Sequence, residues 1–258
     1  MPLLVDSTRI MCTLVILRRP DHPWPLLIAG NRDELSERPA SPPARHWQDR
    51  PEVVAGLDRL GGGSWLGGND FGVLASVMNR AGTLGPMPDK RSRGELVLEA
   101  LDHAEAQQAA AALKALDPRA YRPFNLFVGD PVSAYWLRHA GERIEVFEIG
   151  PGLHMLTSAN LNDPSDPRIR LYLPRFRNAS APDPEREDWR AWQSLLASRL
   201  YPQDQGPRAA MNLDLSAGFG TVSSSVLGVP RHPGFGARCR WWFADGQPDR
   251  VAFAPVEW

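Results

Sequence analysis

The segment from residue 11 to residue 34 holds the most reactive combination of side chains in the sequence. It begins Met11-Cys12-Thr13, and two short apolar runs separated by a turn lead to Asn31-Arg32-Asp33-Glu34. If translation begins at Met11 and this methionine is removed, Cys12 carries both a thiol and a free α-amine. An α-amine has a pKa of about 8, so near neutral pH part of it can accept the thiol proton, while a nearby arginine favours the thiolate. One residue then supplies a nucleophile and its base.

These residues also have an ordinary structural interpretation. A free cysteine is usually a small buried hydrophobic residue. The run at 31–34 is equally compatible with a charged hairpin loop. Asp33 holds the α-amine in position only if the fold brings the two groups together, so the residue types alone leave both interpretations open.

The glycine-rich run at 61–68 matches no nucleotide-binding loop. No six-residue window of the run fits the motif G-x-G-x-x-G, and no lysine follows it as in a P-loop. Ser64 misses the nucleophile elbow because Leu66 stands where the second glycine is required. We interpret the run as a tight turn between strands. The six histidines are scattered without paired His or Cys at ligand spacing, so we expect no metal site and no cofactor.

Short apolar runs punctuated by 22 glycines and 25 prolines predict a strand-rich chain. The predicted strands are 13–17, 26–29, 72–77, 125–128, 134–138, 144–149, 220–227, 238–243 and 250–253, the last two joined by a hairpin at Asp245-Gly246. A capping box at 92–95 predicts a helix start, and 105–116, 167–176 and a segment that begins at 183 are also predicted helical. The proline-rich stretches 39–51 and 201–208 are predicted loops. Strands, helices and strands in this order indicate an α+β fold with a largely antiparallel sheet.

Composition narrows the class of protein. The 258 residues carry a formal charge of −1 without Lys/Arg runs, which excludes a main role in binding nucleic acid. No apolar window is long enough for a membrane span and no signal peptide is evident, so we expect a cytoplasmic protein. Two cysteines, Cys12 and Cys239, are too few for a secreted disulfide framework and are expected to be free thiols. The length favours one large domain.

An ordered series of short motifs along the chain resembles the transport and Golgi organisation protein 2 family, also called the NRDE family. The matching segments are Met11-Cys12-Thr13, Ala29-Gly30-Asn31-Arg32-Asp33-Glu34, Gly56-Leu57-Asp58, Gly62-Gly63-Ser64-Trp65-Leu66-Gly67, Asn79-Arg80, Ser92-Arg93-Gly94-Glu95-Leu96, Phe124-Asn125-Leu126 and Leu161-Asn162-Asp163-Pro164. The family's proteins typically begin Met-Cys. The resemblance therefore implies a single domain over residues 12–258, with residues 1–11 a misassigned start or a removed extension.

That family is grouped with the N-terminal nucleophile hydrolases, so the resemblance implies a four-layer αββα sandwich. In the cysteine branch, which includes bile-salt hydrolase and penicillin V acylase, a hairpin after the N-terminal cysteine supplies an Arg and an Asp. Arg32 and Asp33 match this pair, and Asn79 matches an Asn that contributes to the oxyanion hole. The resemblance implies a catalytic set of Cys12, Arg32, Asp33 and Asn79.

The chain departs from the family pattern at two places. The family's Leu-Ser-Asn reads Leu156-Thr157-Ser158 here, so an expected Asn is absent unless Asn160 replaces it. The family's Tyr-Gly-Thr-Arg reads Phe219-Gly220-Thr221-Val222, which removes an Arg. We assign Asn31, Trp65 and Asn160 to substrate binding.

Two classes of function follow from the resemblance. The first is a hydrolase of a C–N (amide) or related acyl bond in a small molecule, with Cys12 as nucleophile. The second is a non-catalytic carrier of haem or of an acyl-CoA or lipid, because eukaryotic relatives are implicated in such ligand handling. An apolar cleft rimmed by Trp65 and Arg32 suits a flat or acyl ligand, although no axial-ligand motif for haem iron is evident. The sequence does not indicate an oligomeric state.

Overall fold

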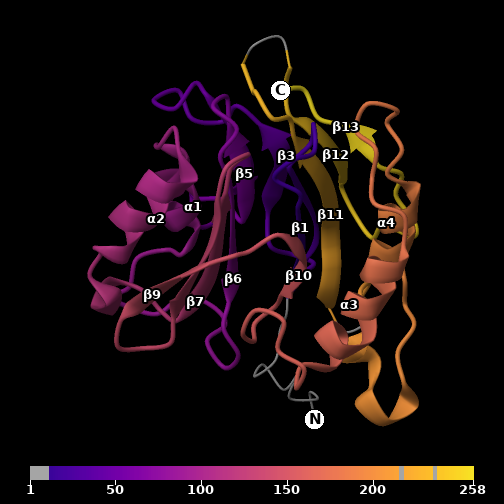
Figure 1. The fold of residues 1–258 in the computed structure, drawn as a ribbon. Coiled ribbons are helices and arrows are strands. Elements are labelled where there is room, and N and C mark those ends of the chain that lie inside the picture. The colour runs from indigo at the N-terminus through magenta and orange to yellow at the C-terminus, as the bar shows by residue number, and fades with distance from the viewer. Residues whose placement is uncertain (1–11, 215–217, 235–236) are drawn as a thin grey trace, which may run out of the picture.

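Two antiparallel sheets form the centre of the computed structural model, which describes residues 12–214, 218–234 and 237–258 (Figure 1). One sheet contains, in spatial order, β10 (Gly152–Leu156), β1 (Thr13–Arg18), β2 (Leu26–Leu35), β11 (Phe219–Val229), β12 (Arg240–Ala244) and β13 (Ala254–Pro255). The other contains β3 (Ala40–Ala44), β4 (Val53–Asp58), β5 (Leu66–Asn69), β6 (Leu74–Asn79), β7 (Phe124–Gly129), β8 (Ala134–His139) and β9 (Ile144–Glu148). Neighbouring strands pair antiparallel throughout both sheets.

Helices cover the outer face of each sheet. The α-helices are α1 (Gly94–Leu101), α2 (Ala106–Lys114), α3 (Pro167–Asn178) and α4 (Arg190–Leu196), and short 3-10 turns are η2 (Pro118–Ala120), η3 (Gln203–Gln205) and η4 (Pro207–Ala209). Buried side chains of α1 and α2 pack on the seven-stranded sheet, and those of α3 and α4 pack on the six-stranded sheet. Figure 1 shows the resulting order of helices, sheet, sheet and helices. The α+β, αββα architecture expected from the resemblance is confirmed.

Strand alternation divides the side chains of β1 between two cores. Leu14 and Ile16 point between the sheets, where they pack with Leu66 and Leu74 of the opposite sheet. Val15 points the other way, into the core beneath α3 and α4. Because successive side chains of a strand face opposite sides, the register of β1 and β2 decides which residues reach the space between the sheets.

Polar side chains accept hydrogen bonds from backbone N–H groups at two of the helix starts, and only half of the capping box predicted at 92–95 forms. At α1, the Glu95 carboxylate accepts from the Ser92 backbone N–H at 3.3 Å, as a capping box requires. The Ser92 hydroxyl accepts from Gly94 N–H rather than from the third residue, and Arg93 is the N-cap. At α3, the Asp166 carboxylate accepts from the backbone N–H groups of the second and third helical residues, which anchors this helix beside the end of β10.

Four local predictions are wrong. The stretch 39–51 contains β3, an edge strand in which proline costs little because one side lacks a partner. The glycine run includes β5, since a Cβ at Gly67 would lie 2.5 Å from that of Ala55 and only glycine permits this approach. The helix predicted from 183 begins at Arg190. The strand predicted at 250–253 is a turn, and β13 follows it.

The reasons for the last two corrections are local. Asp183 and Asp188 exchange backbone hydrogen bonds across a tight loop, and Glu187 adopts a φ of 54°, which no right-handed helix contains. The backbone N–H groups of Arg250 and Val251 both donate to the carbonyl of Gln247, which closes a turn instead of extending a strand. In the described ranges, no helix is long and apolar enough to cross a membrane.

Candidate active site

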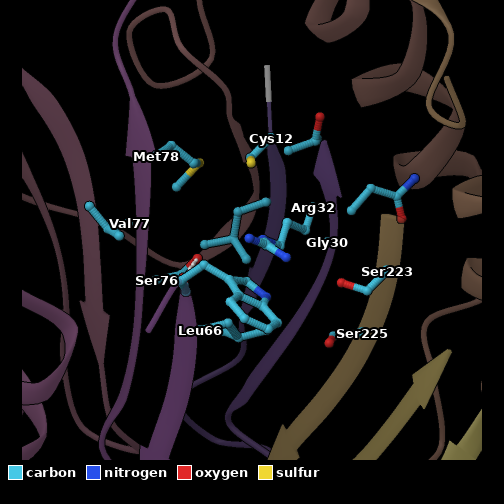
Figure 2. Close-up of a pocket in the computed structure, with 13 residues that line it drawn as sticks. Cys12, Gly30, Arg32, Leu66, Ser76, Val77, Met78, Ser223 and Ser225 are labelled. Atoms are coloured by element: carbon cyan, nitrogen blue, oxygen red, sulfur yellow. Dashed lines mark hydrogen bonds between the residues drawn. The ribbon is translucent and has the colours of Figure 1, made fainter. Parts of the chain in front are cut away.

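Cys12 immediately precedes β1, and its side chain faces the space between the two sheets. It lines a small cavity together with Arg32, Trp65 and Ser223. Figure 2 shows Cys12, Arg32 of β2 and Ser223 of β11 around this cavity. The other lining residues are Thr13, Leu14, Gly30, Asn31, Leu66, Ser76, Val77, Met78 and Ser225. The cavity volume is about 20 Å³, enough for about one water molecule. An acyl group therefore enters only if lining side chains move, and the flexible thioether of Met78 is suited to this.

Three residues form a row across β1, β2 and β11. Thr13 pairs with Asn31, so Cys12 lies opposite Arg32, and Arg32 in turn pairs with Ser223. The three side chains share the face that looks between the sheets. Adjacent strands are about 4.8 Å apart, so Arg32 occupies the middle of the row within reach of both neighbours.

Arg32 is held by an aromatic ring and by a carboxylate. Its guanidinium lies 4.2 Å from the centroid of the Trp65 ring, a cation–π contact. Its Nη2 is 3.9 Å from a carboxylate oxygen of Glu34. The Trp65 ring in turn packs against Gly56, where a Cβ would lie 2.4 Å from ring atoms. Burial lowers the pKa of Arg32, and nearby Cys12 and Glu34 partly offset this effect, so the guanidinium is a fixed cation beside the thiol.

The thiol of Cys12 is a poor acid in this environment. It donates to the main-chain carbonyl of Asp33 at a sulfur–oxygen distance of 3.6 Å. Burial, and next to it the negative charge of Asp33, raise the pKa of Cys12 to about 12 against the opposing effect of Arg32. Near neutral pH the sulfur is therefore protonated, and nucleophilic attack requires a base that removes this proton.

The carboxylate of Asp33 lies on the opposite side of β2 from Arg32. Its Oδ2 accepts from Nη1 of Arg168 in α3 at 2.9 Å, and its Oδ1 accepts from the Thr221 hydroxyl at 2.7 Å. The same Arg168 nitrogen donates to the Thr13 hydroxyl at 2.6 Å. Both side chains of the ion pair are fully buried. Burial raises the pKa of Asp33, while Arg168 and Thr221 oppose the increase. The described contact between Asp33 and Cys12 thus runs through a main-chain carbonyl.

Asn31 fastens the sheet to the helical layer. Its side-chain amide donates to the carbonyls of Leu196 at 3.0 Å and Met211 at 2.9 Å, and its oxygen accepts from the Ser224 hydroxyl. Only 2% of the residue is exposed. These contacts use the amide on the helix side of β2, so Asn31 borders the cavity through its main chain.

Asn79 and Asn160 lie outside the cavity lining. Asn79 ends β6 opposite Phe124, and strand alternation places its side chain on the other face from Met78, which lines the cavity. Asn160 accepts from Nη2 of Arg80 at 3.1 Å. The sequence-predicted residues that the structure brings together in the cavity are therefore Cys12, Arg32 and Trp65, with Asn31 at its border.

Asn125 links the two sheets near this site. Its amide nitrogen donates to the carbonyls of Thr157 and Ala159 at 2.8 and 2.7 Å, just after β10. Its oxygen accepts from Arg80 at 2.7 Å and from the Trp136 indole at 3.1 Å. Sequence reasoning included Asn125 only as part of a motif. A buried Asn inside an apolar strand was the available signal, because such an amide needs partners from other elements.

At both departures from the family pattern, a threonine hydroxyl forms a hydrogen bond within the protein. The Thr157 hydroxyl donates at 2.8 Å to Asp166, the cap of α3. Thr221 bonds Asp33, as described above, and Val222 is the extra residue of a β-bulge between Thr221 and Ser223. Arg168 and Ser223 were absent from the predicted site, since neither belongs to a motif that sequence spacing connects to Cys12.

Comparison with solved structures identifies the class to which this architecture belongs. The chain is similar to penicillin V acylase from Agrobacterium tumefaciens, with a TM-score of 0.52, 12% identity, and 95% of this chain and 84% of that chain covered. It is also similar to the R18L variant of conjugated bile acid hydrolase from Clostridium perfringens, with a TM-score of 0.54, 10% identity, and coverage of 96% and 97%. The fold is that of the N-terminal nucleophile hydrolases.

The sequence itself defines the family more narrowly. The family model for transport and Golgi organisation 2 matches residues 11–239. The chain belongs to this family, as its motifs predicted. A search of curated proteins gives no match in sequence.

Proposed function

We propose that the protein is a cysteine N-terminal nucleophile hydrolase that cleaves a C–N (amide) or related acyl bond of a small molecule. The observation that carries the proposal is the cavity between the sheets, into which Cys12 and the fixed cation Arg32 both project. The names of the two structural relatives, an acylase and a bile acid hydrolase, agree with acyl chemistry on this fold. Because these relatives are only 12% and 10% identical in sequence, their likeness to this chain supports the fold and not the activity.

The chemistry of the cavity favours an α-amine as the base. The described residues that line the cavity include no His, Lys, Asp or Glu side chain, so none can accept a proton near neutral pH. A thiol with a pKa of about 12 needs such a base. The α-amine of Cys12, once the peptide bond from Met11 is broken, lies on the same residue as the sulfur. The proposal therefore requires Cys12 to be the first residue of the active protein.

The proposed reaction proceeds in two balanced steps. The Cys12 sulfur forms a bond to the acyl carbon as its proton passes to the α-amine, and the same proton then goes to the leaving nitrogen as the C–N bond breaks. Water next attacks the thioester and gives one proton to the amine, which passes it to the sulfur as the C–S bond breaks, so that the carboxylic acid and the Cys12 thiol are released. Arg32 stabilises the negative charge that develops beside it. The oxyanion-donor role of Asn79 and the substrate contacts of Asn31, Trp65 and Asn160 stay predictions.

Asp33 acts on the amine rather than on the sulfur in this proposal. Its negative charge raises the pKa of the thiol, which opposes formation of the thiolate. The same field stabilises a positive charge, so it favours the ammonium that forms when the α-amine of Cys12 accepts the thiol proton. Asp33 is thus a positioning and electrostatic residue behind the strand.

The organisation of the chain and its location follow as further parts of the proposal. Residues 12–258 are proposed to form one domain, and residues 1–11, which lie outside the described residues, to be a misassigned start or a removed extension. A cytoplasmic location fits the composition. The alternative function, carriage of haem or of an acyl-CoA or lipid without catalysis, is an outcome of the experiment below.

The experiment compares protein that begins at Cys12 with the full chain and with the variants Cys12→Ser and Cys239→Ser. Each is mixed with 4-nitrophenyl butyrate, and intact-mass spectrometry follows the acyl adduct. We expect an acyl thioester on Cys12 only in protein with a free Cys12 amine. Cys239→Ser is the matched control, because Cys239 is the other free thiol and is buried. It should leave the adduct unchanged.

Two results would contradict the hydrolase. The first is the absence of an acyl adduct on protein that begins at Cys12, combined with clean binding of haem or butyryl-CoA in a titration; this outcome supports the carrier. The second is an adduct of equal yield in the full chain, which would show that the α-amine is not the base.

A further inference from the structure

The hydroxyl of Ser223 is the polar group in the cavity that the proposed mechanism leaves unused. Ser223 belongs to β11, is 4% exposed and lines the cavity with Cys12 and Arg32. Figure 2 shows its oxygen directed into the cavity, toward Arg32. The Ser223 oxygen is not among the fully enclosed polar atoms that lack a partner, so it keeps an open side and can donate to a group bound in the cavity.

Neighbouring serines have their partners within the protein. The Ser76 hydroxyl donates to the carbonyl of Trp65 at 3.0 Å, and the Ser225 hydroxyl accepts from the Trp241 indole at 3.1 Å. The Ser224 hydroxyl, on the other face of β11, donates to the amide oxygen of Asn31. Among the described residues, no group forms a hydrogen bond with the Ser223 hydroxyl.

The strand register places this hydroxyl where an acyl oxygen would lie. Cys12, Arg32 and Ser223 occupy successive strands in one row, so the backbones of Cys12 and Ser223 are about 10 Å apart. Arg32 stands between their side chains, and the cavity that all three line must widen from the size of one water molecule before a carbonyl oxygen can lie against the Ser223 hydroxyl. A bulge between Thr221 and Ser223 lies at this point, and bulges commonly re-aim side chains at active sites.

We propose that Ser223 donates a hydrogen bond to the acyl oxygen of the substrate that Cys12 attacks, opposite the guanidinium of Arg32. The inference rests on the proposed hydrolase function and adds a residue to it. When the sulfur bonds to the acyl carbon, the electron pair of the C=O bond moves to oxygen. The Ser223 hydroxyl and the Arg32 cation then face this oxyanion from two sides. The bond strengthens in the transition state, so it accelerates acylation more than it tightens binding.

The test uses protein that begins at Cys12, with 4-nitrophenyl butyrate as the probe and the rate of acyl-Cys12 formation as the readout. Ser223→Ala is expected to slow acylation at saturating probe by about 100-fold, with the half-saturating concentration changed by less than about threefold. The isosteric pair Ser223→Thr and Ser223→Val separates the hydroxyl from packing. Thr should acylate within about tenfold of the parent protein, and Val should behave like Ala.

The outcomes distinguish this inference from the proposal beneath it. If the parent protein acylates and Ser223→Ala or Ser223→Val does so at a similar rate, Ser223 is not the donor and the hydrolase proposal stands. If the parent protein that begins at Cys12 does not acylate, both proposals fail. Should Ser223→Ala not fold, the rates of the Thr and Val variants still decide, because these two side chains have the same shape.

Discussion

The buried ion pair between Arg168 and Asp33 gives the sharpest prediction of stability. Its atoms are 2.9 Å apart and both side chains are fully buried. Arg168→Met removes the cation and leaves the Asp33 carboxylate in the interior with Thr221 as its remaining donor among the contacts described above. A charge left unpaired in the interior is far more costly than a charge left at the surface.

The expected loss follows from the burial of this pair. Removal of one partner of a buried pair costs about 3–5 kcal/mol of unfolding free energy. Arg168 also donates to the Thr13 hydroxyl and to the carbonyl of Arg208. The stability lost in Arg168→Met alone therefore exceeds the contribution of the Arg168–Asp33 pair. A double-mutant cycle with Asp33→Asn isolates the pairwise contribution. In Arg168→Met combined with Asp33→Asn no charge is left unpaired, so the loss should be smaller than the sum of the two single losses.

The assay is urea unfolding followed by circular dichroism. The matched control is Arg190→Met, because Arg190 and Asp188 are also 2.9 Å apart but lie at the surface, where the side chains are 86% and 46% exposed. This control should lose little or no stability, because solvent screens an exposed ion pair. If the unfolding free energy falls no more in Arg168→Met than in Arg190→Met, burial does not increase the contribution of the Arg168–Asp33 pair to stability, and the reasoning is refuted.

Three further predictions concern the residues around the thiol. Because the pKa of Cys12 is about 12 instead of 9.0, alkylation of Cys12 by iodoacetamide in the full chain near pH 8 should be about 1,000-fold slower than that of an unhindered thiol, and comparable rates would contradict the burial effect. Burial also raises the pKa of Cys239, so both thiols stay protonated in the folded state while the unfolded chain ionises; the unfolding free energy should fall from about pH 9 upward, and Cys12→Ser with Cys239→Ser should flatten this fall. Gly56→Ala should displace the Trp65 ring from Arg32 and change tryptophan fluorescence, whereas an unchanged spectrum would show that the contact yields at no cost.

Local pattern predicted several of the strands that alternate or are continuously apolar, but not β4 or β10. β1, β7 and β8 appear within a residue of the predicted bounds, because their side chains fill a core on one or both faces. β3 and β5 were missed because proline and glycine normally end strands. Only the sheet edge around β3, and the close approach of Ala55 to Gly67, make these residues acceptable, and both are tertiary facts.

The candidate site was predictable in part for the same reason. The short spacing from Cys12 to Arg32 makes a hairpin of β1 and β2, which brings the two residues to one level of the sheet. The partners of Asp33 come from α3 and β11, 135 and 188 residues away, and no local pattern links them. Ser223 reaches the cavity through the pairing of β11 with β2, which is likewise invisible to spacing.

The adjacency of Arg32 and Asp33 in the sequence also hid the fact that their side chains have different surroundings. Two consecutive residues of a strand face opposite sides, so their side chains cannot both contact the same thiol. The Arg32 side chain projects into the cavity, whereas the Asp33 carboxylate points into the helical layer, where it pairs with Arg168. The group of Asp33 that contacts the Cys12 sulfur is its main-chain carbonyl. Burial and Asp33 then keep the thiol protonated against the pull of Arg32. On the proposed mechanism, the thiol lacks a base as long as Cys12 is preceded by a peptide bond. Release of an α-amine at this residue would then supply both the base and the positive charge that Asp33 stabilises.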